Sequence, residues 1–483
     1  MRYARDAQLA MLQGVTRNGP QSSRHMLIGG MGLGKSGAAL LWAGMQEMMY
    51  GTWPGVIIAA PLQVCFGWRK EIPLWMPNKH IGMLTGTESE RMQTLRTGAD
   101  IYVVNYEQLP WLDRTVPNWA GLGRMFFADE STRLKHTRAS FQTSSLGNRF
   151  LRRDGGGRTN ALASHAAEFT WWLNMSGTPA PNGMTDLWGQ YWYLDGGKRL
   201  GTSYTDFERR FFSVPRRGDS FSKPILIEGA REKILSLVSD VTTVVRTEDY
   251  YQLDKPRVVD RTVELPTKAL KAYQDMRYRL RMEIEHDLQT KQVGVLTAAA
   301  KAAKLLQIAA GFAYYEADED PDLQLCTILH EAKLDAVNSI LEETQESLVV
   351  FYQHTAVLQM LQAKFKKRLR TLDKRGVEQD RWNEGKTELL AIQYMQGAEG
   401  LSLQHGGRNI CFMEPTHWAD KYEQAIERLG PLRQMQSGYQ RNVNVFRILA
   451  DKTDDRRVFD NTTAKMSEQD QAISMLQSLG VQF

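Results

Sequence analysis

A glycine-rich turn, placed between an apolar run and a helix-forming stretch, constrains the fold of this chain more than any other feature. Residues 27–40 read LIGGMGLGKSGAAL, and the turn fits the pattern G-x-x-x-x-G-K-[ST]. Glycines let the backbone adopt positive φ angles and bring its N–H groups close to phosphate oxygens, and the helix that follows presents its positive N-terminus. The pattern predicts a strand, a phosphate-binding loop and a helix. An ordinary glycine-rich turn with a surface lysine is the alternative interpretation.

Each position of this turn has an expected role. Lys35 can reach the β- and γ-phosphates as a point charge, and Ser36 can place its hydroxyl on Mg²⁺. The backbone that surrounds the phosphates is expected from Gly30, Gly32, Leu33 and Gly34. The chain is therefore predicted to bind a nucleoside triphosphate.

The size and composition of the chain limit its class. A chain of 483 residues is too long for one hydrophobic core, so we expect two or three domains. Hydrophobic residues make up 42% and charged residues 24%, which is typical of soluble globular proteins. No apolar run approaches the roughly 18 residues that span a bilayer, and the N-terminus lacks the pattern of a secretory signal. We expect a cytoplasmic protein without a membrane partner.

Short apolar strands alternate with helical stretches along the chain. Strands are predicted in GVIIAAP, IYVVNY, RMFFADE and TWWLNMSGT, and a second series follows in SLVVFYQH, TELLAIQYM, NICFMEPT and NVFRILA. The alternation is typical of parallel sheets with crossover helices, whose ligands gather at the carboxyl ends of the strands. We predict one α/β domain over residues 1–255 and a second over 256–483. A helical hairpin at about 266–312 is expected to project from or between them.

Two adjacent carboxylates end the strand in RMFFADE. A phosphate-loop enzyme needs an acid at such a strand end to hold the metal and often a second carboxylate to orient the attacking water. We assign Asp129 to the metal and Glu130 to the base. An exposed acidic turn is the alternative interpretation.

Eight motifs then occur in a characteristic order. They are GGMGLGKS, APLQVCFGWRKEIPLW, VVNYEQL, DESTRLKH, NMSGTPAPNGMTDLWGQYWYLD, LVVFYQH, MQGAEGLSLQ and YEQAIERLGPLRQ. In this order and spacing, over residues 3 to 470, the chain resembles the superfamily 2 helicases, most closely the Swi/Snf-like double-stranded DNA translocases. Its compact size is similar to that of the bacteriophage members of this group.

The resemblance implies a fold, ligands and partners. It implies two tandem RecA-like domains, with motifs Q, I, Ia, Ib, II and III in the first and IV, V and VI in the second. ATP and Mg²⁺ are the implied cofactors. Duplex DNA, contacted through its backbone with little sequence specificity, is the implied partner, together with phage replication or recombination proteins. We expect a monomer in the cytoplasm of the host cell.

The resemblance also assigns individual residues. Arg5 and Gln8 fall where members of the family contact the adenine base. A side-chain amide such as that of Gln8 can bond both the donor and the acceptor of that base. Gly400 falls in a second-domain motif that borders the nucleotide. Gln424, Arg428 and Arg433 fall in the last motif, where arginine closes over the γ-phosphate. The residues assigned to nucleic acid are Trp68, Arg69, Tyr106, Ser176, Thr178 and His354. A core position is the alternative for Trp68, since a tryptophan between apolar strands usually packs inside, and a surface or packing role is the alternative for His354.

Two positions depart from the chromatin-type pattern. Those proteins carry the second arginine of the last motif seven positions after the glutamine, where this chain has Pro431 and places Arg433 two residues later. The acidic motif reads DES in place of a box that contains histidine. The first departure moves the finger role from position 431 to Arg433, and the second changes the residue that couples the motifs while both carboxylates stay.

Three functions follow from these patterns. The leading hypothesis is an ATPase that moves along duplex DNA and remodels DNA or displaces bound protein. A strand-separating or branch-migrating helicase on forks or RNA is the second. A nucleotide-controlled clamp that binds DNA without productive turnover is the third, and the displaced arginine is the feature that favours it.

Overall fold

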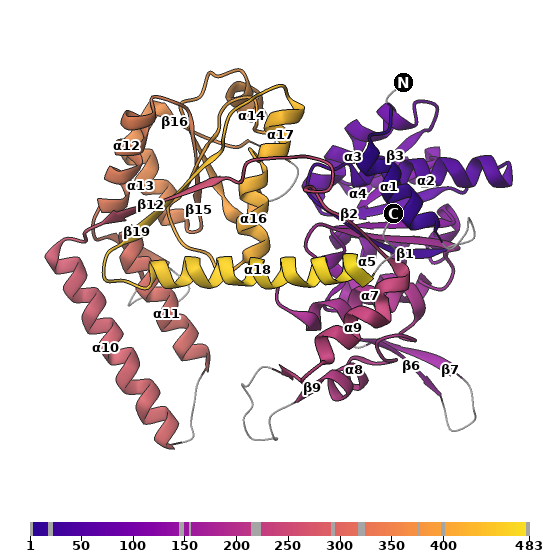
Figure 1. Ribbon diagram of the computed structural model, residues 1–483, viewed down its shortest axis with the longest axis horizontal. Coiled ribbons are helices and arrows are strands. Elements are labelled where there is room, and N and C mark those ends of the chain that lie inside the picture. Colours follow the sequence, from indigo (N-terminus) through magenta and orange to yellow (C-terminus); the bar gives the residue numbers. More distant parts are fainter. Residues whose placement is uncertain are drawn as a thin grey trace. The chain divides into compact units, whose positions relative to one another are not determined.

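The computed structural model describes residues 3–17, 23–143, 149–153, 156–213, 224–290, 295–316, 324–373, 377–397 and 401–479. The chain forms two compact units, each built around its own sheet (Figure 1). Unit 1 runs to Gln252 and takes in the end of the C-terminal helix from Ser467, whereas unit 2 covers Leu253–Met466.

Unit 1 is built on a seven-stranded sheet in which neighbouring strands are parallel. Its central strands are buried along their whole length, as strands covered by helices on both faces must be. In their order across the sheet, the strands are β11 (Thr242–Val245), β1 (Arg24–Gly29), β8 (Trp171–Ser176), β5 (Met125–Asp129), β2 (Val56–Ala60), β4 (Ile101–Asn105) and β3 (Ile81–Leu84).

Helices join these strands and cover the sheet of unit 1. They are α1 (Asp6–Thr16), α2 (Lys35–Tyr50), α3 (Leu62–Trp75), α4 (Glu88–Thr97), α5 (Leu109–Thr115), α6 (Gly157–His165), α7 (Leu187–Asp195), α8 (Tyr204–Phe211) and α9 (Ala230–Val238). Two small antiparallel hairpins, β6–β7 (Ala139–Thr143 and Arg149–Arg153) and β9–β10 (Phe212–Ser213 and Ile225–Leu226), extend from this unit.

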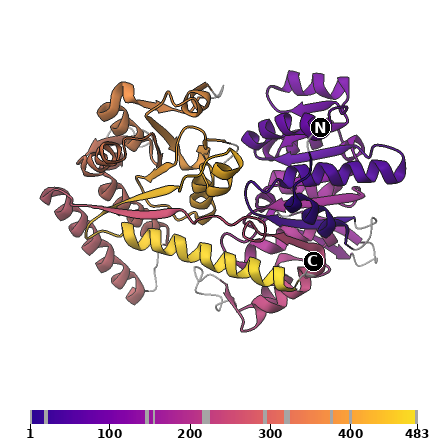
Figure 2. The ribbon, with the colours of Figure 1, turned by 45° about the horizontal axis from the view of Figure 1, so that its top comes forward.

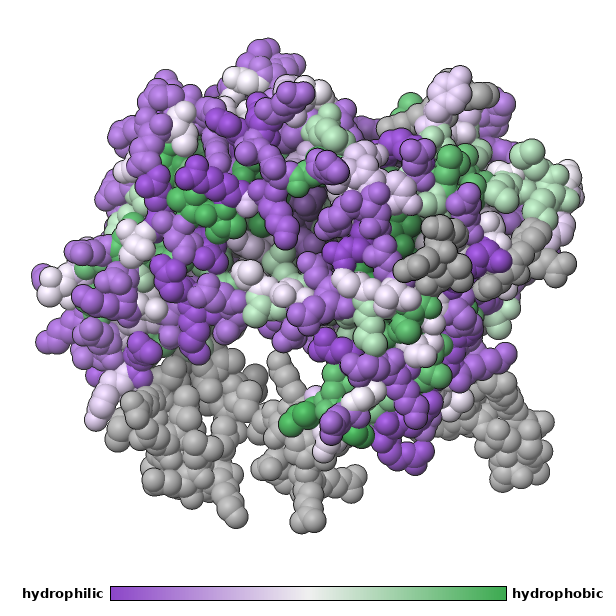
Figure 3. Space-filling view, in the orientation of Figure 1, coloured by the Kyte–Doolittle hydropathy of each residue, from purple (hydrophilic) through white to green (hydrophobic). Residues whose placement is uncertain are grey.

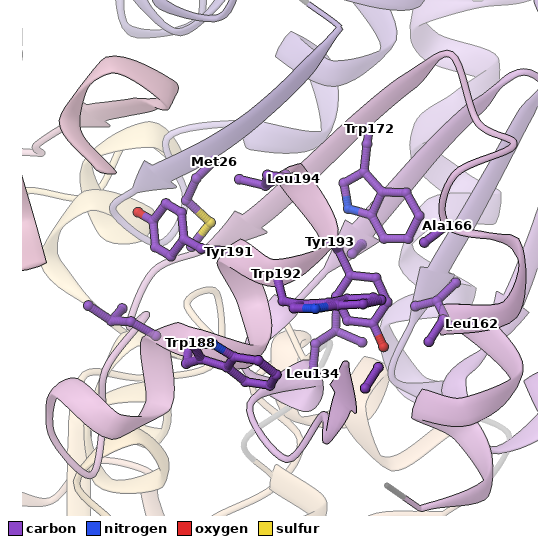
Figure 4. Close-up of a cluster of buried hydrophobic side chains, with 14 of the residues drawn as sticks. Met26, Leu134, Leu162, Ala166, Trp172, Trp188, Tyr191, Trp192, Tyr193 and Leu194 are labelled. Atoms are coloured by element: carbon purple, nitrogen blue, oxygen red, sulfur yellow. The ribbon is translucent and has the colours of Figure 1, made fainter. Parts of the chain in front are cut away.

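Aromatic side chains fill the core between α7 and the sheet of unit 1 (Figure 4). Trp188, Tyr191, Trp192 and Tyr193 of α7 are all buried. The ring of Tyr193 stacks on Trp172 of β8, with centroids 5.2 Å apart and planes 8° from parallel. Such rings bury large apolar areas, so this packing anchors α7 against the sheet.

Unit 2 repeats the architecture with a six-stranded sheet whose neighbouring strands are parallel. Across this sheet the strands are β12 (Arg257–Val263), β19 (Asn444–Ala450), β18 (Asn409–Phe412), β15 (Leu348–Tyr352), β17 (Leu389–Gln393) and β16 (Leu369–Thr371). The flanking helices are α12 (Ala332–Thr344), α13 (Thr355–Phe365), α14 (Val377–Asn383), α15 (Tyr394–Gly397), α16 (Ala419–Glu427) and α17 (Pro431–Gln436). The expected fold class, two tandem RecA-like α/β domains, is confirmed.

A helical hairpin projects from unit 2, as the sequence predicts. Helices α10 (Thr267–Thr290) and α11 (Val295–Ala310) pack side by side (Figures 1 and 2). Tyr273 lies at the buried base of the hairpin, and its hydroxyl accepts a hydrogen bond from the backbone N–H of Asp454 at 2.8 Å. The antiparallel pair β13–β14 (Phe312–Glu316 and Gln324–Ile328) follows α11.

The C-terminal helix differs from the domain division predicted from the sequence. We expected everything after residue 255 to form the second domain, but α18 (Asp455–Leu479) ends in unit 1. Ala472, Ile473 and Leu476 join the hydrophobic core of that unit. An apolar helix face does not indicate in the sequence which of the two sheets it packs on. A domain boundary drawn at one sequence position therefore assigns the end of α18 to the wrong unit.

The surface in Figure 3 is mainly hydrophilic, with apolar residues in small separate patches. Within the part of the chain that the structure describes, no helix combines the length and apolar character that crossing a bilayer requires.

Candidate functional site

The carboxyl ends of three neighbouring strands of unit 1 bring the predicted motifs together. Strand β8 lies between β1 and β5, and its last residue, Ser176, is level with Ile28 of β1. Asp129, the last residue of β5, is level with Met175 of β8. Because all three strands are parallel, the glycine-rich loop, the acidic pair and the SGT segment follow them at one edge of the sheet. Ligands of open α/β sheets bind at this edge.

The loop after β1 has the backbone that phosphate binding requires. Gly32 and Gly34 have φ angles of 80° and 93°, which favour glycine. A Cβ atom on Gly34 would lie 2.5 Å from both the Arg5 guanidinium and the Gln8 amide, so the loop has no space for a side chain there. Lys35 begins α2 and its Nζ donates a hydrogen bond to the carbonyl oxygen of Gly29 at 2.9 Å. The ammonium therefore lies across the mouth of the loop.

Burial and close packing stabilise the shape of the loop at its other residues. Leu33 is fully buried and anchors the turn. A Cβ atom on Gly30 would come within 2.4 Å of the Thr247 hydroxyl. Thr247, which follows β11, is a neighbour of the loop that the sequence did not reveal. Ser36 is the second residue of α2, one position after the lysine.

Arg5 and Gln8 brace the same loop. The Gln8 amide donates to the carbonyl oxygen of Gly34 at 3.0 Å and accepts from the backbone N–H of Arg5 at 3.1 Å. The Arg5 guanidinium donates to the carbonyl oxygen of Gly32 at 3.3 Å. Gln8 is 1% exposed, so its amide is used to shape the loop. The sequence-based assignment of both residues to the nucleotide is consistent with this position beside the loop, and contact with the base stays a prediction.

Asp129 is held by hydrogen bonds in a buried position. Its Oδ2 accepts the indole N–H of Trp68 at 2.8 Å, and its Oδ1 accepts the backbone N–H of Glu130 at 3.1 Å. Burial raises the pKa of the Asp129 carboxyl, and the nearby Lys35 ammonium opposes that rise. Glu130 has a φ of 52°, a left-handed conformation that is uncommon outside glycine and typical of functional turns.

Trp68 and Tyr106 are not on the surface, which corrects their assignment to nucleic acid. Trp68 is 2% exposed and Tyr106 is fully buried. The Tyr106 hydroxyl donates to the carbonyl oxygen of Asp129 at 2.9 Å. Both aromatic side chains therefore support the acidic residue from inside the domain. The sequence shows an aromatic residue at each position, but a buried ring with one polar atom and a solvent-facing ring have the same local pattern.

Ser176 and Thr178 are also buried, so their assignment to nucleic acid is corrected in the same way. The Ser176 hydroxyl accepts the backbone N–H of Thr178 at 3.0 Å and closes a tight turn. A Cβ atom on Gly177 would lie 3.9 Å from the Lys35 ammonium and 3.5 Å from the carbonyl oxygen of Gly29. The SGT segment thus packs directly on the glycine-rich loop.

A buried glutamine that sequence reasoning missed connects two of these motifs. Gln190 of α7 accepts the Ser131 hydroxyl at 2.8 Å and donates to the carbonyl oxygen of Pro179 at 2.6 Å. Ser131 and Gln190 are both fully buried. These two hydrogen bonds, from Ser131 to Gln190 and from Gln190 to Pro179, therefore join the segment after the acidic pair to the segment after SGT. The DES sequence indicated that the residue linking the acidic motif to other motifs differs from the chromatin-type pattern. It did not indicate which residue takes that place, because Gln190 lies about 60 positions away.

The arginines of the last motif lie together in unit 2. Arg428 and Arg433 each donate to the carbonyl oxygen of Leu401 at 3.2 Å, and Arg433 also donates to the Ser402 hydroxyl at 3.2 Å. Burial lowers the pKa of the Arg433 guanidinium. Gln424 is buried in α16, where its amide accepts from the Lys421 ammonium at 3.4 Å. Gly400 lies outside the described residues.

The two remaining candidates for nucleic acid have different environments. Arg69 is exposed on α3. His354 is half-buried, and its Nδ1 lies 2.6 Å from Glu414, whose carboxylate also accepts the backbone N–H groups of Gln353 and His354. Glu414 thus ties together the ends of β15 and β18.

The donors present fit a phosphate-bound magnesium ion better than a protein-enclosed one. Among the described residues, no group of three or more His, Cys, Asp and Glu side chains could enclose a metal. Mg²⁺ beside phosphates needs only one or two protein oxygens, and its remaining ligands are water and phosphate. Ser36 and the desolvated Asp129, which feels the charge of Lys35, are such donors.

Two known proteins are similar to this chain in sequence. No family model matches the sequence. A protein named p41 from Acyrthosiphon pisum secondary endosymbiont phage 1 is 35% identical over 450 residues, which cover 91% of this chain and 92% of p41. The protein named helicase swr1 of Emericella nidulans is 25% identical over 227 residues, which cover 45% of this chain and 12% of swr1.

A similarity among solved structures was also found. The Sulfolobus solfataricus SWI2/SNF2 ATPase core in complex with dsDNA matches with a TM-score of 0.42 and 17% identity, over 99% of this chain and 94% of that one. The match to p41 extends over nearly the full length of both proteins. The chain belongs to the same family as phage protein p41.

Proposed function

We propose that this protein is a DNA-dependent ATPase that moves along duplex DNA and remodels it or displaces bound protein. The observation that carries the proposal is the convergence at one sheet edge of a phosphate-binding loop, its lysine and a desolvated aspartate. Lys35 is close enough to Asp129 to oppose the rise in the pKa of that carboxyl. Family membership with a phage protein and the similarity to a protein named helicase support the same conclusion.

In this proposal, each candidate site residue at the carboxyl edge of the unit 1 sheet has a part in hydrolysis. Lys35 would leave the carbonyl oxygen of Gly29 and bind the β- and γ-phosphates, because a phosphate oxygen is a stronger acceptor for an ammonium. Ser36 and Asp129 would hold Mg²⁺, which when bound neutralises charge on the phosphates. Glu130 would orient the attacking water and accept its proton.

The arginines of unit 2 supply the remaining charge in this proposal. Arg428 and Arg433 are rigidly placed by their bonds to Leu401, and a planar guanidinium can bond two oxygens of the transferring phosphoryl group. Arginine fingers of this kind raise turnover by about 10³ to 10⁵ in phosphate-loop enzymes generally. In this proposal they act on the γ-phosphate of ATP.

Duplex DNA is the proposed partner, and its phosphates the proposed contact. Arg69 offers an exposed charge on α3, the same helix that contacts Asp129 through Trp68. His354 remains a candidate contact in unit 2. Binding through phosphates should be insensitive to sequence and should weaken as salt rises. A role beside phage replication or recombination proteins, in the host cytoplasm and as a monomer, completes the proposal.

Steady-state ATP hydrolysis tests this function. Turnover would be measured without nucleic acid and with single-stranded DNA, duplex DNA or RNA, each at two salt concentrations. We expect duplex DNA to stimulate hydrolysis strongly and salt to reduce the stimulation. Lys35→Ala should abolish hydrolysis, whereas Lys198→Ala, at an exposed lysine of the same unit, should not. Equal turnover with and without DNA would contradict the translocase, and measurable unwinding of a forked substrate would favour the strand-separating helicase.

A further inference from the structure

Trp68 joins helix α3 to the carboxylate of Asp129. Helix α3 buries one stripe of side chains, Cys65, Trp68 and Ile72, at the spacing of successive helical turns. The indole N–H of Trp68 points at Asp129 and donates to its Oδ2 at 2.8 Å. The two side chains are 2% and 7% exposed, so water does not compete for this bond.

This bond restricts how the carboxylate can turn. The other oxygen of Asp129 accepts the backbone N–H of Glu130 at 3.1 Å. Each oxygen therefore has one donor in place, and an ionised carboxylate still has lone pairs left on both oxygens. Rotation about the last side-chain torsion of Asp129 would break both bonds. The free lone pairs are thus presented in one fixed orientation.

We propose that Trp68 is a positioning residue that holds Asp129 in the orientation that binds Mg²⁺. The inference rests on the proposed function, in which Asp129 holds the Mg²⁺ of Mg-ATP. Trp68 itself touches neither the metal nor the nucleotide. It acts through Asp129, because a donor bonded to a metal ligand orients that ligand, and loss of such a donor typically weakens metal binding about 10- to 100-fold.

Helix α3 also contacts the phosphate-binding helix, which gives it two points of contact with the site. A Cβ atom on Gly37, in the first turn of α2, would lie 2.7 Å from the Trp75 ring. The same helix exposes Arg69, the residue next to Trp68. A shift of α3 would therefore move the donor to Asp129 and the side chain that packs on α2 at the same time.

A purely structural role for Trp68 is the rival explanation, and the chain contains a matched control for it. Trp188 is also fully buried in unit 1, and its indole N–H donates to the carbonyl oxygen of Gly201 at 2.9 Å. Substitution by phenylalanine at either position removes one ring and one donor from the same domain. Only the Trp68 donor is bonded to Asp129, so only its loss should change the requirement for Mg²⁺.

The experiment is an equilibrium titration of the full-length protein. Calorimetry would measure the affinity for a non-hydrolysable ATP analogue at a series of Mg²⁺ concentrations, in the parental protein and in the variants Trp68→Phe and Trp188→Phe. We expect Trp68→Phe to need about 10-fold more Mg²⁺ for the half-maximal gain in affinity. Trp188→Phe should match the parental protein in Mg²⁺ requirement, while thermal melting reports the loss of packing in both variants.

The outcomes separate this inference from the proposed function. Equal Mg²⁺ requirements in Trp68→Phe and Trp188→Phe would overturn the role of Trp68 and leave nucleotide binding by the parental protein intact. A parental protein that binds no nucleotide would overturn both. If Trp68→Phe does not fold, hydrogen exchange of residues 62–75 in the parental protein carries the test. Addition of Mg²⁺ to the analogue should slow exchange in α3, and unchanged exchange would contradict the inference.

Discussion

Arg428 and Arg433 donate hydrogen bonds to one carbonyl oxygen, that of Leu401, and each does so at 3.2 Å. Helix α16 ends at Glu427, and a new short helix, α17, begins at Pro431. Proline is favoured at the first position of a helix, because its missing N–H has no partner there and its φ is already helical. The helix break turns the chain so that an arginine displaced by two residues in sequence lies beside Arg428. The two guanidinium groups therefore meet at one carbonyl oxygen despite the altered spacing in the sequence.

The first prediction is that both arginines act in turnover. Arg428→Lys and Arg433→Lys should each lower kcat for ATP hydrolysis by about 10³-fold, because lysine keeps the charge but loses the planar fork. Substrate binding should change much less, so KM should stay within a few-fold. Arg457→Lys, at an exposed arginine of unit 2 that pairs with Asp454 at 3.2 Å, is the control. Parental turnover in Arg433→Lys would show that Arg428 acts alone.

The second prediction concerns the base. Glu130→Gln should bind Mg-ATP with nearly parental affinity but hydrolyse it about 10²- to 10⁴-fold more slowly, since an amide cannot accept the proton of the attacking water. Filter binding of labelled ATP and single-turnover hydrolysis would measure the two effects separately. If the parental protein retained ATP as long as this variant, the protein would be a nucleotide-controlled clamp.

The sequence was sufficient to predict the parallel sheets and the glycine-rich loop between strand and helix, because both depend on local patterns. Strands appear in the sequence as short apolar runs, and the loop needs glycines at fixed spacings before its lysine. The same holds for the strand that ends in Asp129, because it reads as an apolar run that a carboxylate closes.

Burial of the supporting residues could not be predicted in this way. Trp68, Tyr106, Ser176 and Thr178 are assigned to nucleic acid through the resemblance, and for Trp68 the sequence leaves a core position open as well. The partners of Tyr106 and Trp68 come from distant parts of the chain, because both meet Asp129, 23 and 61 residues away. Which polar atom satisfies which buried donor depends on tertiary packing, and a single sequence contains no signal for it.

The third prediction is that Gln190 and Ser131 act as a unit. Ser131→Ala and Gln190→Leu each leave a buried polar group without its partner, which typically costs about 1–3 kcal/mol. The double variant should cost less than the sum of the two, because neither polar partner remains. A double-mutant cycle, with unfolding free energies from urea titration, measures this coupling. Strict additivity would show that the bond of 2.8 Å contributes nothing in solution.

The fourth prediction concerns a buried ion pair in unit 2. Lys333 Nζ lies 2.5 Å from Asp455 Oδ2, with the side chains 1% and 0% exposed, and also donates to the carbonyl oxygen of Met413. Lys333→Met should destabilise unit 2 by about 3–5 kcal/mol, because it leaves a buried carboxylate without its cation. Arg457→Ala, which removes an exposed pair, should cost less than about 1 kcal/mol. Calorimetric unfolding compares the two, and equal effects would show that Lys333 is readily replaced by solvent.

The fifth prediction is a pH dependence that originates at His25 in β1. Burial, with a smaller effect of the Arg17 charge, lowers the pKa of His25 from its usual 6.5 to about 3, and its Nε2 lies 2.7 Å from the Thr243 hydroxyl. The native state thus keeps this imidazole neutral, whereas the unfolded chain binds a proton below pH 6.5. Stability should therefore fall as the pH drops from 6.5 toward 3, by about 2 kcal/mol at pH 5. His25→Gln lacks this loss, so the difference in unfolding free energy between the two proteins should narrow by that amount between pH 7 and pH 5.

Ten of the 12 tryptophans precede Gln252, so urea unfolding followed by tryptophan fluorescence reports mainly on unit 1. Parallel stability curves for the two proteins would mean that His25 is protonated in the native state.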